Sequence, residues 1–264
     1  MYDSYDELVD KLHKIRDELA QNPDRVSSNC GPLVFGILGM GVVGQGARDV
    51  FIELGAQQIP AESLEAIDQL DSSKMYYVEL GRKHFLQKDG KCEFSHEDYT
   101  LNKSDYENVF CQKYLSKLSV LALSIAWTPE YPPLITKEGI DSLLNDPHSR
   151  LMAIGDLACI ANGPVEFLKS CKTSESPFFY YDSTNGVSDF AEEAASDSII
   201  YLAVEKLPSE LPKEGSHMFE SSLSAYLKDI CEKETLDYEH MDDELKTGAI
   251  ISKGQFTDKY SYLG

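Results

Sequence analysis

The chain has 264 residues, 42% of them hydrophobic, which is enough to bury a core in one large or two small domains. Its 45 acidic residues outnumber its 24 Lys and Arg residues, and the formal net charge of −21 argues against a nucleic acid or an anionic membrane as the main partner. No apolar run approaches the ~20 residues that span a bilayer. The acidic start MYDSYDEL predicts no export or transit signal.

The N-terminal residues predict a helix followed by a linker. Ser4-x-x-Glu7 has the form of a capping box, and apolar residues recur at helical spacing, so residues 5–20 should form an amphipathic helix. Residues 22–32, rich in Asn, Ser, Pro and Gly, should be a linker, which gives a first segment of residues 1–30.

The rest of the chain alternates between predicted strands and helical or irregular segments. Strands are expected at 33–38, 56–59, 75–80, 118–127, 151–155 and 198–204, with a helix at 42–54 and an insertion at 87–113. Strands that alternate with helices and long crossovers form a parallel, doubly wound sheet. We therefore expect an α/β, Rossmann-like domain over residues 31–264, preceded by the amphipathic helix.

A cluster of glycines lies between the first predicted strand and the following helix. Gly39, Gly41 and Gly44 form the pattern G-x-G-x-x-G, in which the first glycine permits a tight turn, the second lets a pyrophosphate approach the backbone, and the third lets helix and strand pack closely. The N–H groups of Val42 and Val43, at the start of the helix, would face the phosphates. The pattern favours a dinucleotide. Packing glycines, or another nucleotide-like ligand such as S-adenosylmethionine, are the alternatives.

The choice of dinucleotide depends on residues after the second and third strands. NAD-binding domains place an acidic residue on the ribose about 20 residues after the glycines. Here Pro60 stands at that position, so NADP is not excluded, and Arg82 or Lys83 after the third strand could meet its 2′-phosphate. Glu62 could instead serve NAD, or cap the next helix.

Five ordered segments carry a resemblance to a known family: VFGILGMGVVGQGARDVF, LMAIGDLACIANGPVEFLKSC, SPFFYYD, VEKLPSELPKEGSHMF and AIISKGQFTDKYSYL. Over roughly residues 31–262 the chain resembles the lysine–ketoglutarate reductase half of alpha-aminoadipic semialdehyde synthase, in the alanine dehydrogenase-like group. The resemblance implies NADPH-dependent reductive condensation of lysine with 2-oxoglutarate to saccharopine, with NADH as the alternative cofactor. It also implies the mitochondrial matrix as location, with the cytoplasm as the alternative.

The resemblance places the segment from Asp156 to Phe167 beside the nicotinamide and the substrate. It also implies that the general acid–base groups belong to an N-terminal domain that precedes the glycines in the family. In this chain only a helix and a linker stand there, so the catalytic residues stay unknown and the chain by itself should be inactive. A saccharopine dehydrogenase domain could follow, and a homo-oligomer is possible.

Within the shared region the chain departs from the family's pattern. The family's D-x-S-x-D becomes Asp156, Ala158 and Ile160, its D-N-L-P becomes EKLP at 205–208, and an arginine becomes Pro133. Each change removes a polar group near the expected cleft. Two hypotheses remain: the cofactor-binding part of a larger reductase, or a non-catalytic nucleotide-binding or regulatory module that keeps the fold.

Cysteines and histidines give no metal-binding pattern. The six histidines show no ligand spacing, and the cysteines form no C-x-x-C pair, so we expect neither a metal site nor a disulfide framework. Asp156, just after a strand, could contact the ligand or cap the turn. The six cysteines are Cys30, Cys92, Cys111, Cys159, Cys171 and Cys231.

Overall fold

The computed structural model describes residues 2–27, 31–88, 94–129, 131–195, 197–232 and 238–263, so two of the cysteines, Cys30 and Cys92, lie outside the described residues. The chain divides into two compact units, Met1–Leu211 and Pro212–Gly264. The boundary that the sequence suggests after residue 30 stays a prediction.

The first unit is built on an eight-stranded sheet, in the order β2-β3-β1-β6-β7-β10-β8-β9. The first six strands of this order are parallel, and β8 and β9 are each paired antiparallel. The predicted Rossmann-like, mostly parallel α/β sheet is thereby confirmed. The strands are β1 (Leu33–Leu38), β2 (Gln57–Gln58), β3 (Met75–Leu80), β6 (Val120–Leu123), β7 (Ala153–Asp156), β8 (Phe178–Asp182), β9 (Gly186–Ser188) and β10 (Ile199–Leu202).

The two antiparallel strands were not predicted from the sequence, where FFYYD served only as a family motif. In β8 the aromatic rings of Phe179 and Tyr181 point into the core, while Phe178 is exposed. This alternation is typical of a strand that is buried on one face. The predicted strand at 118–127 is shorter than expected, because regular pairing ends at Leu123.

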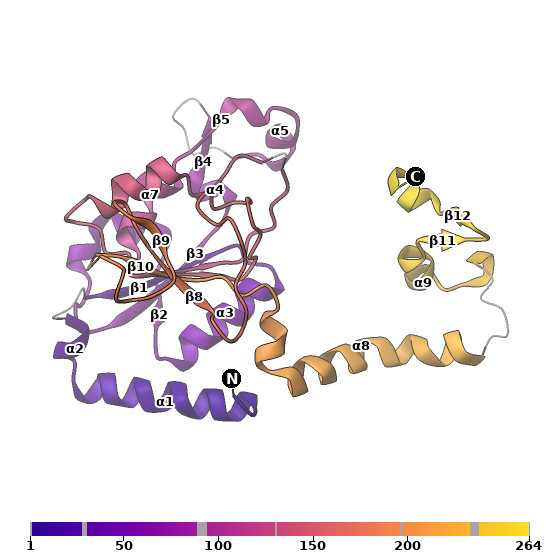
Figure 1. The fold of residues 1–264 in the computed structure, drawn as a ribbon, viewed down its shortest axis with the longest axis horizontal. Helices are drawn as coiled ribbons and strands as arrows, with labels where there is room; N and C mark the ends of the chain where they lie inside the picture. The colour runs from indigo at the N-terminus through magenta and orange to yellow at the C-terminus, as the bar shows by residue number, and fades with distance from the viewer. Residues whose placement is uncertain are drawn as a thin grey trace. The chain divides into compact units, whose positions relative to one another are not determined.

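Each face of the sheet has its own core. On one face α3 (Val42–Glu53) lies against β1 and α1 (Tyr5–Gln21) packs on α3 (Figure 1), and Phe51 stacks on Phe35 with ring centroids 4.6 Å apart. The other face carries the larger core, to which Phe110 and Ile140 belong. Helices on both faces are expected for parallel strands, whose side chains are apolar on both sides.

The N-terminal amphipathic helix is confirmed as α1. Ser4 caps it by accepting a hydrogen bond from the Glu7 N–H at 3.2 Å, and Glu7 in turn accepts from the Asp3 N–H at 2.8 Å. The helix packs on α3, where His13 Nε2 lies 2.6 Å from Glu53 Oε2. This pair fastens the N-terminal helix to the first crossover helix.

The predicted insertion between strands forms a small subdomain at the edge of the first unit. An antiparallel pair, β4 (Leu86–Lys88) and β5 (Tyr106–Asn108), encloses α5 (His96–Leu101). Asp98 joins the parts: its Oδ2 accepts from Lys88 Nζ at 2.9 Å and from the Tyr106 hydroxyl at 2.8 Å. The Lys88 hydrogen bond, followed by those of Asn102 and Tyr106, lowers the pKa of Asp98 to about 2.

The second unit contains a long helix and a small hairpin. Its helix α8 (Pro212–Glu232) was not predicted from the sequence. Residues 233–237, in the acidic stretch 232–244 that the sequence marks as a solvated helix face or loop, lie outside the described residues. Among the described residues of this unit no hydrophobic side chain is fully buried. The unit also contains α9 (Asp243–Gly248), β11 (Ile251–Ser252), β12 (Gln255–Phe256) and the 3₁₀ helices η5 (Tyr238–His240) and η6 (Asp258–Leu263).

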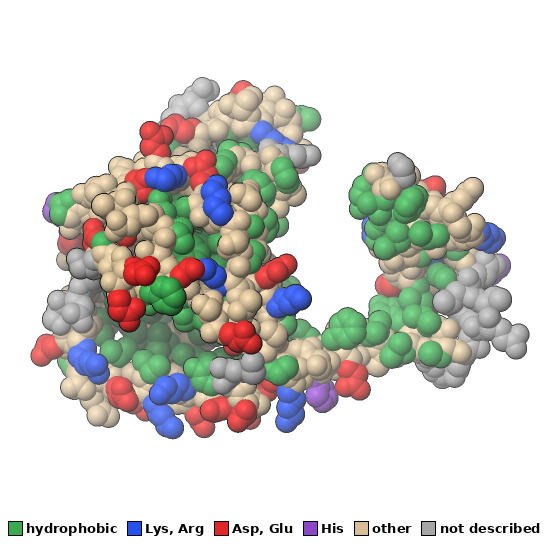
Figure 2. Space-filling view, viewed as in Figure 1, with side chains coloured by type: hydrophobic (Ala, Val, Ile, Leu, Met, Phe, Trp, Pro, Cys, Tyr) green, Lys and Arg blue, Asp and Glu red, His purple; other side chains and the backbone are tan. Residues whose placement is uncertain are grey.

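Short helices complete the first unit: α2 (Asp24–Ser27), α4 (Arg82–Phe85), α6 (Phe110–Lys113), α7 (Lys137–Leu144), η1 (Ala61–Gln69), η2 (Lys103–Asp105), η3 (Leu115–Lys117) and η4 (Leu207–Glu210). In the described part of the chain no helix combines the length and apolar character that crossing a membrane would need. On the face shown in Figure 2, Lys and Arg side chains are scattered among Asp and Glu and form no basic cluster.

Candidate functional site

The glycine pattern forms the turn between β1 and α3. Gly39 has a φ of +97°, a conformation that glycine adopts without strain. A Cβ on Gly44 would lie 1.8 Å from Gly39 O, so this glycine lets the first helical turn pack directly on the strand. A Cβ on Gly41 would have no heavy atom within 4 Å, so the space in front of this residue is open. The three glycines therefore have the three different environments that the pattern predicts.

The first turn of α3 offers hydrogen-bond donors to this open space. Gly41 is the N-cap and has no side chain to cap the helix. Among the described residues, no backbone acceptor receives a hydrogen bond from the N–H of Val42, Val43 or Gly44. Unpaired N–H groups at a helix N-terminus, with the positive end of the helix dipole, suit an anion such as a phosphate.

The strand order changes which segment flanks this turn. The sequence analysis expected the second strand to do so, but β3 pairs directly with β1, Leu38 against Leu80, and β2 lies outside β3. Gly39 N–H also donates to Leu80 O at 3.0 Å. The neighbour of β1 on this side is therefore β3 and not β2, which sequence order does not reveal. The roles of Pro60, Arg82 and Lys83 toward the ribose stay predictions.

A cleft of about 630 Å³ opens beside the glycine turn. Its lining comes mainly from three segments: Met40 from the turn, residues 58–62 around the end of β2, and residues 79–84 around the end of β3. Of the predicted cofactor-binding residues, Arg82 lines this cleft. Such a cleft at the carboxyl ends of parallel strands is where open α/β sheets bind their ligands.

The two cations of the cleft differ in their surroundings. The Arg82 guanidinium lies 4.8 Å from the centre of the Tyr131 ring, a cation–π contact that orients it. Lys83 is exposed. His84 accepts a hydrogen bond from the Gly81 N–H at 2.9 Å through Nδ1, and burial, followed by the charge of Lys83, lowers its pKa. This hydrogen bond makes His84 a cap of the turn at Gly81.

Asp156 ends β7 and is fully buried. Its Oδ1 accepts from the N–H groups of Ala158 and Cys159, at 3.1 and 2.8 Å, and its Oδ2 accepts from the Tyr201 hydroxyl at 2.8 Å. Burial raises its pKa. Of the two roles that the sequence left open, this geometry describes the turn cap. Asp156 does not line the cleft beside the glycine turn, and a contact with a cofactor stays a prediction.

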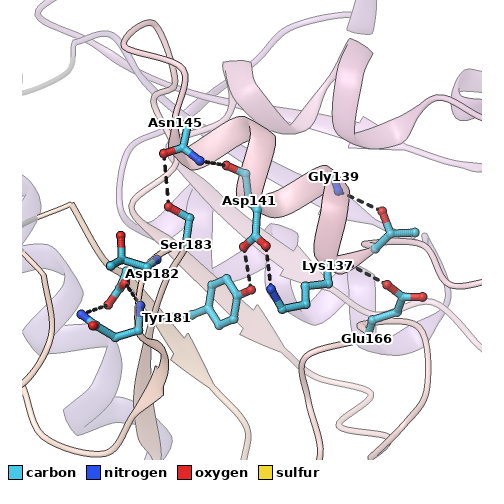
Figure 3. Close-up of polar contacts among 11 residues, drawn as sticks. Lys137, Gly139, Asp141, Asn145, Glu166, Tyr181, Asp182 and Ser183 are labelled. Atoms are coloured by element: carbon cyan, nitrogen blue, oxygen red, sulfur yellow. Dashed lines mark hydrogen bonds and ion pairs between the residues drawn. The ribbon is translucent and has the colours of Figure 1, made fainter.

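A second polar cluster joins α7 to β8 (Figure 3). Asp141 accepts from the Tyr181 hydroxyl at 2.7 Å and from Lys137 Nζ at 2.8 Å, while Glu166 accepts from the Lys137 N–H at 2.6 Å. Each of these carboxylates binds a donor of the protein itself. These hydrogen bonds connect α7 to β8 and to Glu166, so we interpret the cluster as structural and not as a ligand site.

One residue that the sequence analysis missed touches the glycine turn. Ser124, directly after β6, donates through Oγ to Gly39 O at 2.7 Å. The sequence offered no signal for it, because the predicted strand at 118–127 extended past Ser124, whereas β6 ends at Leu123. Within the described residues, no group of three or more His, Cys, Asp or Glu side chains could hold a metal ion.

A parallel sheet with G-x-G-x-x-G between its first strand and first crossover helix is the architecture of dinucleotide-binding dehydrogenase domains. The chain belongs to the family described as alanine dehydrogenase/PNT, C-terminal domain, whose model matches residues 31–259. This family implies a nicotinamide cofactor. The open space at Gly41 and the unpaired N–H groups of α3 fit such a ligand.

Curated relatives carry the name of one enzyme. The chain is 27% identical over 251 residues to the mitochondrial alpha-aminoadipic semialdehyde synthase of Mus musculus, and 26% identical over 245 residues to the alpha-aminoadipic semialdehyde synthase of Arabidopsis thaliana. Both comparisons cover 88% of this chain but only 27% and 23% of the relatives. The chain thus spans about a quarter of their length, and the resemblance seen in the sequence motifs is confirmed.

Proposed function

We propose that this chain binds a pyridine dinucleotide at the glycine turn, with NADPH as the first choice and NADH as the alternative. The observation that carries the proposal is the contrast between Gly44, which is packed against Gly39 O, and Gly41, which faces open space at the N-terminus of α3. The pyrophosphate would accept hydrogen bonds from the N–H groups of Val42 and Val43.

The preference for NADPH is supported by the segment that follows β3. Arg82 and Lys83 follow β3, the neighbour of β1, and line the cleft together with Glu62 and Glu79. A guanidinium and an ammonium in this place suit a 2′-phosphate. The Arg82 guanidinium contacts the Tyr131 ring, which would orient it for a two-pronged hydrogen bond to the 2′-phosphate. The exposed Lys83 ammonium would add a second positive charge.

The relatives support a role in lysine degradation. We propose that the chain is the cofactor-binding part of an oxidoreductase that condenses lysine and 2-oxoglutarate to saccharopine. When bound, the dinucleotide would supply a hydride to the imine that forms, with loss of water, from the lysine amine and the keto group of 2-oxoglutarate. The glycine turn would hold the pyrophosphate, and Asp156 would keep the loop after β7 in shape. The acid–base groups would come from a domain that precedes the glycine turn.

The same proposal extends to partners and location. An N-terminal substrate domain and a saccharopine dehydrogenase domain are proposed as partners in one polypeptide, with lysine and 2-oxoglutarate as substrates and a homo-oligomer as a possible assembly. The mitochondrial matrix is the proposed location because the rodent and bovine relatives are named as mitochondrial. The cytoplasm is the alternative.

A non-catalytic nucleotide-binding or regulatory module is the second candidate. It is favoured by Ala158 and Ile160, which replace polar residues of the family's pattern in the loop after β7. Such a module would keep the cofactor site, but the loop after β7 would lack the polar groups that the family uses beside its substrate.

Calorimetric titration of the purified chain with NADPH and with NADH tests the binding proposal. Saturable binding of at least one cofactor is expected, and heat of dilution alone for both would overturn it.

A spectrophotometric assay of NADPH oxidation with lysine and 2-oxoglutarate separates the candidates. The 264-residue chain should give little turnover, since positioned acid–base groups typically contribute about 10²–10⁴-fold. A longer parent that contains the preceding domain should turn over if the chain belongs to the reductase. Robust turnover by the short chain would show that the catalytic groups lie within it.

A further inference from the structure

Ser124 follows β6 and lies beside the glycine turn, but no motif of the sequence includes it. It is the first residue after Leu123, at the carboxyl end of the strand that pairs with β1 on the side opposite β3. Its side chain is partly buried. The residue is therefore placed at the edge of the sheet where the glycine turn begins.

Three contacts join Ser124 to the start of this turn. Its N–H donates to Leu38 O at 2.9 Å, and its hydroxyl donates to Gly39 O at 2.7 Å with Leu38 O as a second acceptor at 3.0 Å. A Cβ on Gly39 would lie 2.9 Å from Ser124 O, so the two backbones also touch. The turn is thus held to β6 by both the main chain and the side chain of one residue.

Two residues approach the Gly39 carbonyl oxygen. Gly44, whose missing Cβ would lie 1.8 Å from this oxygen, and the Ser124 hydroxyl, which donates to it at 2.7 Å, are both close to it. Among the described residues, Ser124 supplies the hydrogen bond that this carbonyl receives. Without the hydroxyl, the oxygen would lose this donor, and the peptide between Gly39 and Met40 would be held less firmly in its present orientation.

We infer that Ser124 is a positioning residue that fixes the glycine turn in the orientation that receives the cofactor pyrophosphate. This inference rests on the proposed function, because the turn's ligand is the proposed dinucleotide. Ser124 acts through the Gly39–Met40 peptide, which sets where Gly41 and the first N–H groups of α3 point. Preorganised donors of this kind bind an anion more tightly than mobile ones.

The chain offers a matched control on the same strand segment. Ser119, just before β6, is fully buried, and its Oγ accepts a hydrogen bond from Val34 N–H at 3.1 Å. It joins the two strands at the amino end of β1, far along the strand from the glycine turn. Ser119→Ala therefore removes a serine–β1 hydrogen bond without touching the turn.

The experiment compares the wild type with Ser124→Ala, Ser124→Thr and Ser119→Ala. Hydrogen exchange of the peptide covering residues 39–46 reports on the turn without cofactor, and calorimetry with NADPH reports on binding. Ser124→Ala should speed exchange in this peptide and weaken NADPH binding about 2- to 13-fold, the equivalent of one net hydrogen bond. Ser119→Ala should lower the Tm but leave exchange in this peptide and NADPH affinity unchanged. Ser124→Thr keeps the hydroxyl and should restore both readouts.

The outcomes separate this inference from the proposed function. If Ser124→Ala leaves both exchange at residues 39–46 and NADPH affinity at the wild-type values, or if Ser119→Ala changes them equally, the positioning role is wrong. If the wild type binds no dinucleotide, the proposed function fails, while the exchange comparison still decides whether Ser124 orders the turn.

Discussion

Gly41, Gly44 and Gly46, at the start of α3, should respond differently to substitution, because their surroundings differ. Gly41→Val adds a side chain whose Cβ would have no heavy atom within 4 Å, so that it extends into the open space in front of the turn. Its φ of −71° is accessible to any residue. The fold should therefore tolerate the change within about 1 kcal/mol, mainly the loss of a favourable N-cap residue.

Gly44→Ala should act on the fold instead. Its Cβ would lie 1.8 Å from Gly39 O and 2.9 Å from Ser124 Oγ, so the strand and helix must separate. Overpacking of this kind typically costs about 1–3 kcal/mol, and a contact with backbone places it at the upper end. At this chain length the expected decrease in Tm is roughly 4–12 °C.

Gly46→Ala is the matched control, because Gly46 is exposed within α3 and a Cβ there also meets nothing within 4 Å. Replacing glycine inside a helix should raise the unfolding free energy by about 0.5–1 kcal/mol. It leaves the turn open, so cofactor affinity should stay at the wild-type value.

Thermal unfolding and calorimetric titration with NADPH, run on all three variants, test this division. Gly41→Val should reduce NADPH affinity roughly 10- to 100-fold, the equivalent of one charge-assisted hydrogen bond, with little change in Tm. A Gly41→Val variant that binds NADPH as tightly as the wild type would refute the assignment of the open space to the pyrophosphate. A Gly44→Ala variant with unchanged Tm would refute the packing argument.

Two further predictions concern the charged candidates. Arg82→Ala and Lys83→Ala should each weaken NADPH more than NADH in the same titrations, by roughly 10- to 100-fold for a contact to the 2′-phosphate, and equal losses for both cofactors would reject a 2′-phosphate contact. Asp156→Ala should lower the unfolding free energy by about 2–4 kcal/mol, because it leaves three donors without their acceptor. Burial raises the pKa of Asp156 above its unfolded value, so its contribution to stability is greatest below the unfolded pKa and is lost as pH rises through the folded pKa. In urea unfolding between pH 3 and 7, the unfolding free energy of the wild type should decrease relative to that of Asp156→Asn as the pH rises, and identical pH profiles would contradict it.

Several elements could be predicted from the sequence because local patterns specify them. The capped helix at 5–20, the buried strand at 33–38 and the glycine turn each depend on residues that are neighbours along the chain. Periodicity and capping express backbone and side-chain preferences of such neighbours, and these preferences persist in the fold. The family resemblance added what separate patterns did not, since five motifs in one order are specific to one group of enzymes.

The sequence alone therefore determined the α/β class and the position of the glycine turn. Only the tertiary structure decided that β3, and not β2, pairs with β1, which gives Arg82 and Lys83 the position beside the turn. It also showed Asp156 enclosed by three donors, and Ser124 on the Gly39 carbonyl, 85 residues away along the chain. Strand order and burial depend on contacts between segments far apart in sequence, and no local preference carries that information.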